Sequence, residues 1–306
     1  MEEGEVTGMG KGHLIRSKED NVVNCMSAVL CVLVFIVTVY PVYYCLVYSF
    51  NEGADAVKGG VYLFPRKFTL ENYKVVFQNA AIYPAFLMTI LRSLIGTALT
   101  VLFSSMAAYA LTKEELWGRR IYMLMGVVTL YFSAGVVQQY LLYRELRLLD
   151  NFWVYIFPNI YQFYYMILFM SFFRELPAAL EESARIDGAG YFAVLFKVVL
   201  PLSAPVLATV ALFAGVWHWN DWFHPAFFIQ NERLMTLPAV LQRAMSLAEA
   251  QQTLQKMTGF ASQTSTTTME SVRYAMLIVS VLPVVLIYPF VQKFFLKGMM
   301  LGAVKE

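Results

Sequence analysis

The stretch RELPAALEESARIDGAGYFAVLFKVVLP, residues 174–201, is decisive for the fold, because it is a polar hairpin set between long apolar segments. Its residue pattern predicts a helix over about residues 177–187, then a tight turn and a second short helix. Pro177 suits the first position of a helix, where its missing N–H has no partner to lose. Glu181 lies in the positive field of the helix amino terminus and can pair with Arg185 one turn later.

The turn of this hairpin is predicted at two glycines. Gly188 and Gly190 can adopt the positive φ values that a chain reversal requires, and Pro201 ends the second helix. One side of the first helix is partly apolar, and the other side is charged and suits a partner surface. The apolar side holds Leu180, Ala184 and Ile186, and the charged side holds Glu182, Arg185 and Asp187.

Long apolar segments lie on both sides of the hairpin. The chain has 306 residues, of which 59% are hydrophobic and 14% charged, whereas roughly a quarter of a soluble domain is charged. A helix of about 20 apolar residues crosses a hydrocarbon core of about 30 Å, and these segments do not alternate in polarity as membrane strands do. The sequence therefore predicts an all-α membrane protein with six transmembrane helices. Their expected bounds are residues 24–49, 86–111, 121–143, 152–173, 204–222 and 274–292.

The polar connections alternate between the two sides of the membrane, so the side of one loop fixes the side of all others. Lys and Arg are nearly balanced between the two sides, and the short loop 112–120 decides the orientation. Its Lys113, Arg119 and Arg120 crowd the ends of two spans, which places the loop in the cytoplasm. The cytoplasm then also holds both termini and the loop 174–203, and the long segments 51–85 and 223–273 lie outside.

Four segments follow from this topology. The first apolar stretch is too long for the core of a signal peptide and is expected to remain as an anchor. The segments are a cytoplasmic tail over residues 1–23, a first helix with its extracytoplasmic loop over 24–85, a five-helix core over 86–292, and a cytoplasmic tail over 293–306.

The hairpin resembles the coupling loop in the permease subunits of binding-protein-dependent ABC importers. The signature of that loop is Glu-Ala-Ala, three residues, Gly, nine residues and Ile-x-Leu-Pro. Its positions are occupied here by Glu182, Ser183, Ala184, Gly188, Val198, Leu200 and Pro201, so that Ser replaces Ala and Val replaces Ile. The resemblance implies a type I importer permease bundle with a cytoplasmic coupling helix, Asp187 included, that docks into a cleft of a separate ATPase. On local chemistry alone, a hairpin that only connects two spans fits as well.

Other stretches are similar to a carbohydrate-uptake subgroup related to maltose-type permeases. AAYALTKEELWGRR (107–120) and WHWNDWFHP (217–225) look like the exits of the family's second and fifth spans, and SFNEGADAVKGG (49–60) and YPFVQKFFLKGMMLGAVKE (288–306) match the subgroup. The resemblance implies an importer of oligosaccharides in a bacterial plasma membrane, and the chain itself would hold no cofactor. The implied partners are a second homologous permease, two cytoplasmic ATPase subunits that bind ATP and Mg, an extracytoplasmic sugar-binding lipoprotein and membrane lipid.

A sugar pathway needs hydrogen-bonding groups and flat apolar surfaces that face the inside of the bundle. The candidates are Gln138, Gln139, Tyr161, Gln162, Tyr164, Trp217 and Asn220. Related permeases often carry proline where Gln138 stands, so a polar amide is expected there in place of a proline kink. The alternative is that the amides bond between helices and the aromatic rings form belts at the membrane interfaces.

Two further groups of polar residues have simpler explanations than chemistry. His218, Asp221 and His224 suggest a metal cluster, but positions six apart diverge around a helix. A polar patch at the outer rim is therefore favoured, and no metal site is predicted. Arg92 lies near the outer end of its span, where its side chain can extend to the headgroups.

Other functions remain as alternatives. An ion-coupled secondary transporter commonly holds ionisable groups at mid-membrane, whereas the predicted spans contain an acidic residue only at one end, Asp221 in the fifth. A membrane enzyme would need a nucleophile with a base, or paired carboxylates, and the three histidines are grouped with neither. An ABC permease for a non-sugar solute also fits the coupling loop. Residues 4–11 lack the spacing of a phosphate loop, so another chain would hydrolyse ATP. The net charge is +2, and because the Lys and Arg residues form no basic stripe, no nucleic-acid partner is predicted.

Overall fold

The computed structural model describes residues 18–56, 58–258 and 268–303, and within these ranges the chain is built from helices. One pair of residues there, Asn51 and Phe68, forms an antiparallel bridge. The elements in chain order are α1 (Lys18–Ser49), α2 (Gly53–Ala56), α3 (Glu71–Gln78), α4 (Ile82–Thr112), α5 (Arg119–Tyr131), α6 (Val136–Glu145), η1 (Phe152–Tyr155), η2 (Phe157–Asn159), α7 (Phe163–Glu175), α8 (Ala178–Ile186), α9 (Tyr191–Val194), η3 (Leu195–Val199), α10 (Leu200–Leu202), α11 (Ala204–Asn220), α12 (Phe223–Phe228), η4 (Glu232–Leu234), α13 (Leu237–Thr258) and α14 (Met269–Ala303). The prediction of an all-α protein is confirmed.

Three helical segments are long and apolar enough to cross a membrane, namely Val22–Ser49, Ile82–Thr112 and Met269–Pro289. Two further pairs of helices pass the same test together but bend between their halves. The segment Phe152–Asn159 meets α7 at 47°, and the segment Tyr191–Leu202 meets α11 at 85°. The described residues thus hold three to five candidate spans, and five of the six predicted spans correspond to them.

The third predicted span, residues 121–143, is broken, so the prediction of one continuous helix there is wrong. Its two halves are α5 and α6, and the chain between them is extended at Phe132 and again at Gly135. The side chain of Gln138 occupies the space that a Cβ at Gly135 would need. Because α5 has 13 residues, it is roughly 20 Å long and cannot cross a core of about 30 Å alone.

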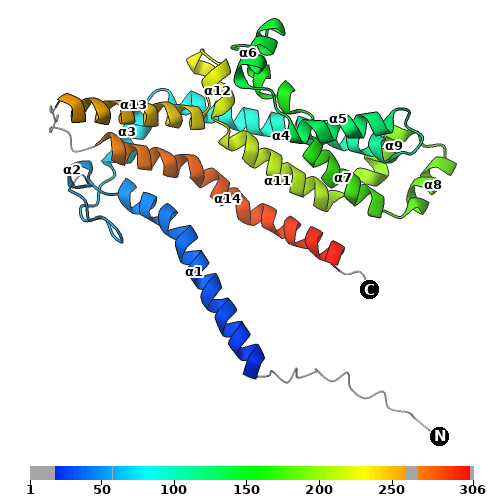
Figure 1. The fold of residues 1–306 in the computed structure, drawn as a ribbon, viewed down its shortest axis with the longest axis horizontal. Coiled ribbons are helices and arrows are strands. Elements are labelled where there is room, and N and C mark those ends of the chain that lie inside the picture. The colour runs from blue at the N-terminus through cyan, green and yellow to red at the C-terminus, as the bar shows by residue number, and fades with distance from the viewer. Residues whose placement is uncertain (1–17, 57, 259–267, 304–306) are drawn as a thin grey trace.

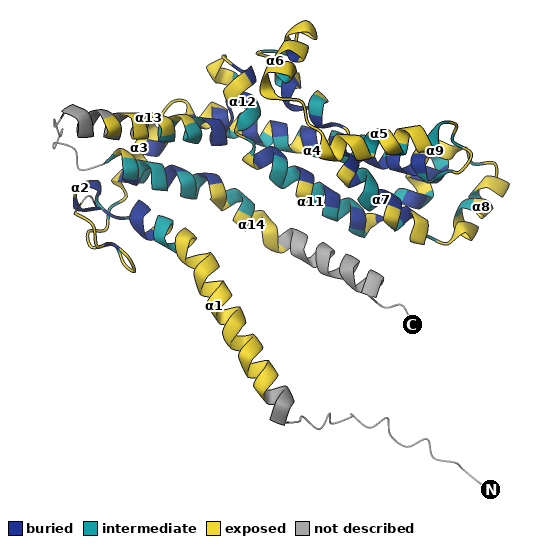
Figure 2. Cartoon of the chain, viewed as in Figure 1, coloured by how far each residue is buried: buried dark blue, intermediate teal, exposed yellow. Residues whose placement is uncertain are grey.

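Helices α4, α7, α11 and α14 form an elongated body (Figure 1). α11 packs against both α4 and α14, and α4 also packs against α7. The carboxyl end of α1 meets the amino end of α14, where the rings of Tyr44 and Tyr48 contact Tyr274. The rest of α1 diverges from the body. Side chains over residues 22–42 of α1 are exposed (Figure 2). An apolar face of this size is expected to meet lipid or another subunit.

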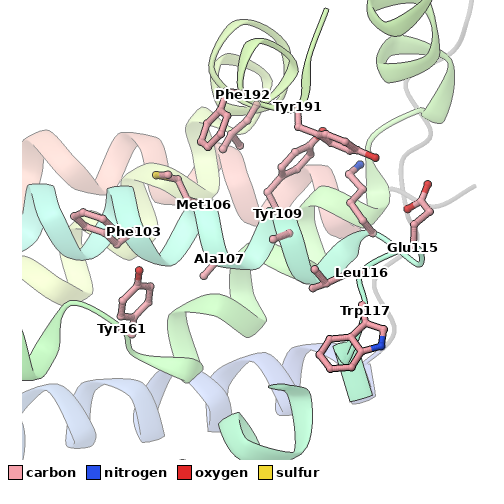
Figure 3. Close-up of a pocket in the computed structure, with 13 residues that line it drawn as sticks. Phe103, Met106, Ala107, Tyr109, Glu115, Leu116, Trp117, Tyr161, Tyr191 and Phe192 are labelled. Carbon is pink, nitrogen blue, oxygen red and sulfur yellow. The ribbon is translucent and has the colours of Figure 1, made fainter. Parts of the chain in front are cut away.

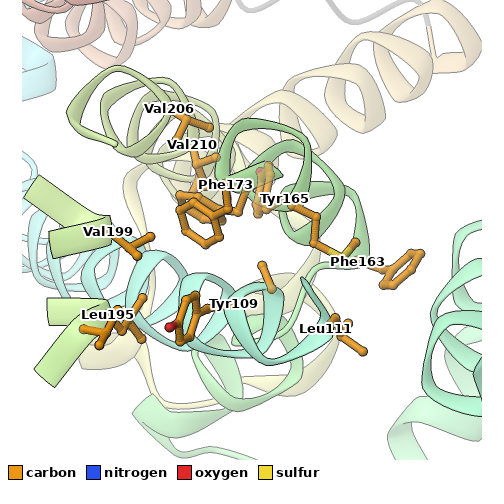
Figure 4. Packing of buried hydrophobic residues seen from close by; sticks show 14 residues of the cluster. Tyr109, Leu111, Phe163, Tyr165, Phe173, Leu195, Val199, Val206 and Val210 are labelled. Carbon is orange, nitrogen blue, oxygen red and sulfur yellow. The ribbon is translucent and has the colours of Figure 1, made fainter. Parts of the chain in front are cut away.

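A buried apolar core lies where α4, α7 and α11 meet the segment α9–η3 (Figure 4). Phe169 and Phe173 of α7 stack with 5.6 Å between their ring centroids, and Tyr109 of α4 meets Phe173 at 6.3 Å. Ala184 of α8 and Ala189 pack against this core. Burial of these rings therefore fixes the place at which the predicted coupling hairpin leaves the body.

The segment between α1 and α4 folds into a small lobe that contains α2 and α3. Buried Asn72 donates hydrogen bonds from Nδ2 to the carbonyl oxygens of Ser49 and Asn51, both at 2.9 Å. The Asp55 carboxylate accepts bonds from Asn51 at 3.3 Å and from Arg66 at 3.0 Å. Burial acts to raise the pKa of Asp55, but these bonds outweigh it and hold that pKa below its usual value.

Candidate functional site

The hairpin forms as a helix, a turn and a second helical segment. Pro177 adopts ψ 123° and precedes α8, so it occupies the N-cap position and not the first helical position. Gly188 has a φ of +83°, as predicted, and its N–H donates to the carbonyl of Arg185 at 2.9 Å. Gly190 has φ −74° and ψ 167°, so the prediction of a positive φ there is wrong. One left-handed residue is sufficient to reverse the chain.

α8 lies at one end of the body and presents most of its surface outward (Figures 1 and 2). The predicted apolar side divides, because Ala184 packs on the core while Ile186 is 86% exposed and Leu180 is 42% exposed. Glu182, Ser183, Arg185 and Asp187 are exposed around them. The exposed surface of the helix therefore combines apolar side chains with charges of both signs, which suits a docking surface.

Glu181 attaches α8 to the carboxyl end of α4. Its carboxylate forms an ion pair with Lys113 and accepts a hydrogen bond from the Tyr109 hydroxyl at 3.3 Å. The ammonium group of Lys113 also lies 4.3 Å from the centroid of the Tyr109 ring. The predicted pair between Glu181 and Arg185 is absent from the described contacts, since Arg185 stacks on Tyr191 at 4.5 Å. The sequence-based prediction missed Lys113 because its partner is 68 residues away.

The second half of the hairpin leads directly into α11. α9 and η3 continue to α10, which holds Leu200 and Pro201, and the chain then bends by 85°. The helix ends one residue after Pro201, as predicted. Val199 is buried at 1% exposure, and Leu200 packs on the same core as Ala184. α8 is thus connected to the body by its side-chain contacts with α4 and the core, and by the covalent chain from α7 and into α11.

Two cavities hold three of the seven predicted pathway residues. A cavity of about 590 Å³ lies beside the hairpin, and aromatic rings that include Phe103, Tyr109, Trp117, Tyr161 and Tyr191 line it together with Lys113 (Figure 3). A cavity of about 670 Å³ lies between α11 and α14 and is lined by Tyr165, Leu212, Phe213, Val216, Trp217, Asn220, Asp221, Trp222, Val284 and Tyr288.

The remaining four pathway candidates, Gln138, Gln139, Gln162 and Tyr164, line neither cavity. Gln139 and Gln162 donate hydrogen bonds to Ala134 and Asn159, at 3.3 and 3.4 Å, which are local contacts. Asn220, although it lines the second cavity, donates to Val216 within its own helix at 2.9 Å. The sugar pathway over these residues stays a prediction.

Arg92 is fully buried, so the prediction that it extends to the headgroups is wrong. It forms an ion pair with Asp221, which is 129 residues later in the chain. His218 is also buried, at 1% exposure, and His224 contacts Asp221 at 2.7 Å. The predicted outer-rim patch is therefore an internal polar cluster. Within the described residues, no three His, Cys, Asp or Glu side chains are placed to hold a metal ion.

Residues 20–300 match the family described as the binding-protein-dependent transport system inner membrane component. Protein LplC of Bacillus subtilis (strain 168) is 34% identical over 269 residues, which cover 88% of this chain and 90% of LplC. The polygalacturonan/rhamnogalacturonan transport system permease protein YtcP of the same organism is 34% identical over 280 residues, which cover 92% of this chain and 94% of YtcP.

A solved structure has the same fold over nearly the whole chain. It is the crystal structure of a bacterial ABC transporter involved in the import of the acidic polysaccharide alginate. The similarity has a TM-score of 0.80 at 29% identity and covers 91% of this chain and 98% of that chain. The family predicted from residues 182–201 is confirmed. The chain belongs to the inner membrane components of binding-protein-dependent transport systems.

Proposed function

We propose that the chain is one of two permease subunits of an oligosaccharide importer that is driven by ATP hydrolysis in separate subunits. Support for a saccharide substrate comes from YtcP, whose name gives polygalacturonan and rhamnogalacturonan, and from the alginate importer. The observation that carries the proposal is α8, an exposed helix held at one end of the body by Glu181 and by the chain into α11.

α8 is proposed to dock into a cleft of a cytoplasmic ATPase. Ile186 is the most exposed apolar side chain of α8 and lies on the face opposite Ala184, where burial against a partner gains free energy. Glu182, Arg185 and Asp187 surround it and would select the partner's orientation through complementary charge. A movement of the ATPase would then displace α4 through Glu181 and α11 through α9 and α10.

The proposed membrane is the bacterial plasma membrane, with both termini in the cytoplasm. In this orientation the lobe between α1 and α4 and the segment 223–273 face outward, where a sugar-binding lipoprotein would dock. The cavity between α11 and α14 is the proposed sugar contact, because Trp217 and Trp222 offer flat apolar faces and Asn220 offers an amide at its edge.

The test is reconstitution of the complex that co-purifies with this chain from its native membrane. We expect an ATPase, a second permease and a sugar-binding lipoprotein to be recovered. Proteoliposomes should take up a labelled oligogalacturonide or alginate oligosaccharide when ATP and Mg are supplied on the ATPase side.

Two alternatives have distinct outcomes in this assay. Uptake on a proton or sodium gradient without ATP would contradict the proposal and favour a secondary transporter, for which the buried pair of Arg92 and Asp221 is the relevant ionisable group. ATP-dependent uptake of a non-sugar solute by the same complex would leave the coupling in place and contradict the substrate class.

A further inference from the structure

α4 carries a stripe of buried polar side chains along one face. Thr89, Arg92, Thr100 and Ser104 are all buried, and with Gly96 they repeat at intervals of three or four residues, which places them in one row. Each polar member contacts a segment outside α4. The Thr89 hydroxyl accepts from the N–H of Leu237 at 2.8 Å, and the hydroxyls of Thr100 and Ser104 donate to the carbonyls of Asn159 and Ile160 at 3.1 and 3.2 Å.

Arg92 is the charged member of this row, and its side chain is fully enclosed. Nη1 donates to the backbone carbonyl of Asp221 at 2.9 Å, and Nη2 pairs with the Asp221 carboxylate. The guanidinium carbon lies 4.6 Å from the ring centroid of Tyr155 and 5.7 Å from that of Trp217. A guanidinium removed from water is stabilised by a counter-charge and by aromatic faces, and this site supplies both.

Asp221 holds the corner at which α11 turns into α12. Its Oδ1 accepts hydrogen bonds from the N–H groups of Phe223 and His224 at 2.9 and 3.3 Å, which are the first N–H groups of α12. Its Oδ2 contacts Nδ1 of His224 at 2.7 Å. The same corner supplies Trp217, Asp221 and Trp222 to the larger cavity.

The two helices are also closely fitted next to this pair. A Cβ on Gly96 would lie 2.5 Å from Cε1 of His218, so glycine is required for α4 and α11 to approach this closely. At its other end α4 holds the coupling hairpin through Tyr109 and Lys113. Arg92 and Tyr109 are 17 residues apart on one helix, which corresponds to roughly 25 Å along its axis.

We propose that Arg92 is a positioning residue for transport. Its pair with Asp221 holds the α11–α12 corner and the adjoining cavity to one end of α4, and the coupling hairpin contacts the other end of α4. Movement of α8 would then reach the cavity through α4 as one rigid element. This inference rests on the proposed function, since it names a route through α4 by which α8 acts on the cavity, beside the direct chain into α11.

The test compares sugar uptake with ATP hydrolysis in the reconstituted complex. Arg92→Gln removes the charge and the ion pair with Asp221, whose contacts with Phe223 and His224 remain, and Arg92→Lys keeps the charge but loses the two-nitrogen contact. Arg144→Gln is the matched control, because Arg144 forms an exposed pair with Glu145 at 3.6 Å. The measured quantity is labelled oligogalacturonide taken up per ATP hydrolysed, which does not depend on the amount of folded complex.

We expect Arg92→Gln to lower uptake per ATP by roughly tenfold, because the corner is no longer fixed to α4. Basal ATP hydrolysis should stay within about twofold of wild type, and Arg144→Gln should match wild type in both. Arg92→Lys should lie between wild type and Arg92→Gln. If Arg92→Gln is poorly recovered, Arg92→Lys carries the test.

Equal losses of ATP hydrolysis and uptake, with an unchanged ratio, would overturn the inference and leave Arg92 a purely structural residue. A wild-type ratio in both Arg92 variants would overturn it as well. These outcomes differ from failure of the proposed function, in which the wild-type complex itself shows no ATP-dependent uptake.

Discussion

Replacement of Gly188 isolates the backbone conformation of the coupling hairpin from every side-chain contact. Its φ is +83°, and an added Cβ would meet nothing within 4 Å, so the cost of a side chain is conformational and not steric. Left-handed backbone costs an L-residue roughly 1–2 kcal/mol, less for Asn and more for a β-branched residue. A cost of this size lowers the equilibrium ratio of native to non-native turn by roughly 5- to 30-fold.

The apparent Kd of the ATPase for the permease should rise by up to this factor, because it is inversely proportional to the fraction of molecules whose native turn presents α8 for docking. We expect Gly188→Asn to bind the ATPase nearly as wild type, Gly188→Ala to bind several-fold more weakly, and Gly188→Val to bind most weakly and to lose transport. Gly190→Val is the matched control, since Gly190 is extended and its Cβ would also meet nothing within 4 Å. Equal affinities for Gly188→Val and Gly190→Val, measured by surface plasmon resonance in detergent, would refute the reasoning.

Three further substitutions test contacts elsewhere in the chain. Glu181→Gln removes the ion pair that joins α8 to α4, and the loss of about 1–2 kcal/mol should speed amide exchange in α8 but not in α7. Exchange at the wild-type rate would show that the pair does not hold the helix. Gly96→Ala would force Cβ against the buried ring of His218 and should destabilise the fold by about 1–3 kcal/mol. Gly215→Ala, whose Cβ would meet its nearest atom at 3.4 Å, is the control, and equal melting temperatures would contradict the close fit. Because the pKa of Asp55 is lowered from 3.8 in the folded lobe, its contribution to stability is present above that pH and is lost as the pH falls through the folded-state value. Protease resistance of segment 51–70 should therefore decline in acid, and Asp55→Asn should remove that decline.

The parts of the hairpin that were predicted correctly depend on residues close together in the chain. The bounds of α8 follow from the cap at Pro177 and the left-handed turn at Gly188, which are properties of a few consecutive residues. Glu181 was assigned the wrong partner because Arg185 is one turn away in sequence, whereas Lys113 is brought to it by packing of α4. Local pattern predicts elements, and it does not show which distant element supplies a partner.

The buried pair of Arg92 and Asp221 could have been inferred in part from sequence. An arginine inside an apolar stretch needs a counter-charge, and Asp221 is the acidic residue at the end of another predicted span. What the sequence does not show is that α4 and α11 cross at this point. The break between α5 and α6 was missed for a different reason, since the residues around Gly135 are apolar enough for a span although the backbone there is extended.

The proposed coupling is tested most directly by cross-linking Ile186→Cys to the ATPase. Ile186 is 86% exposed on α8, so a short thiol-reactive cross-linker should join it to the ATPase in the purified complex, and ATP should change the yield. Leu94→Cys is the control, since Leu94 is 65% exposed on α4, distant from α8. A cross-link from Leu94→Cys but none from Ile186→Cys, or labelling of Ile186→Cys from outside intact cells, would contradict the account.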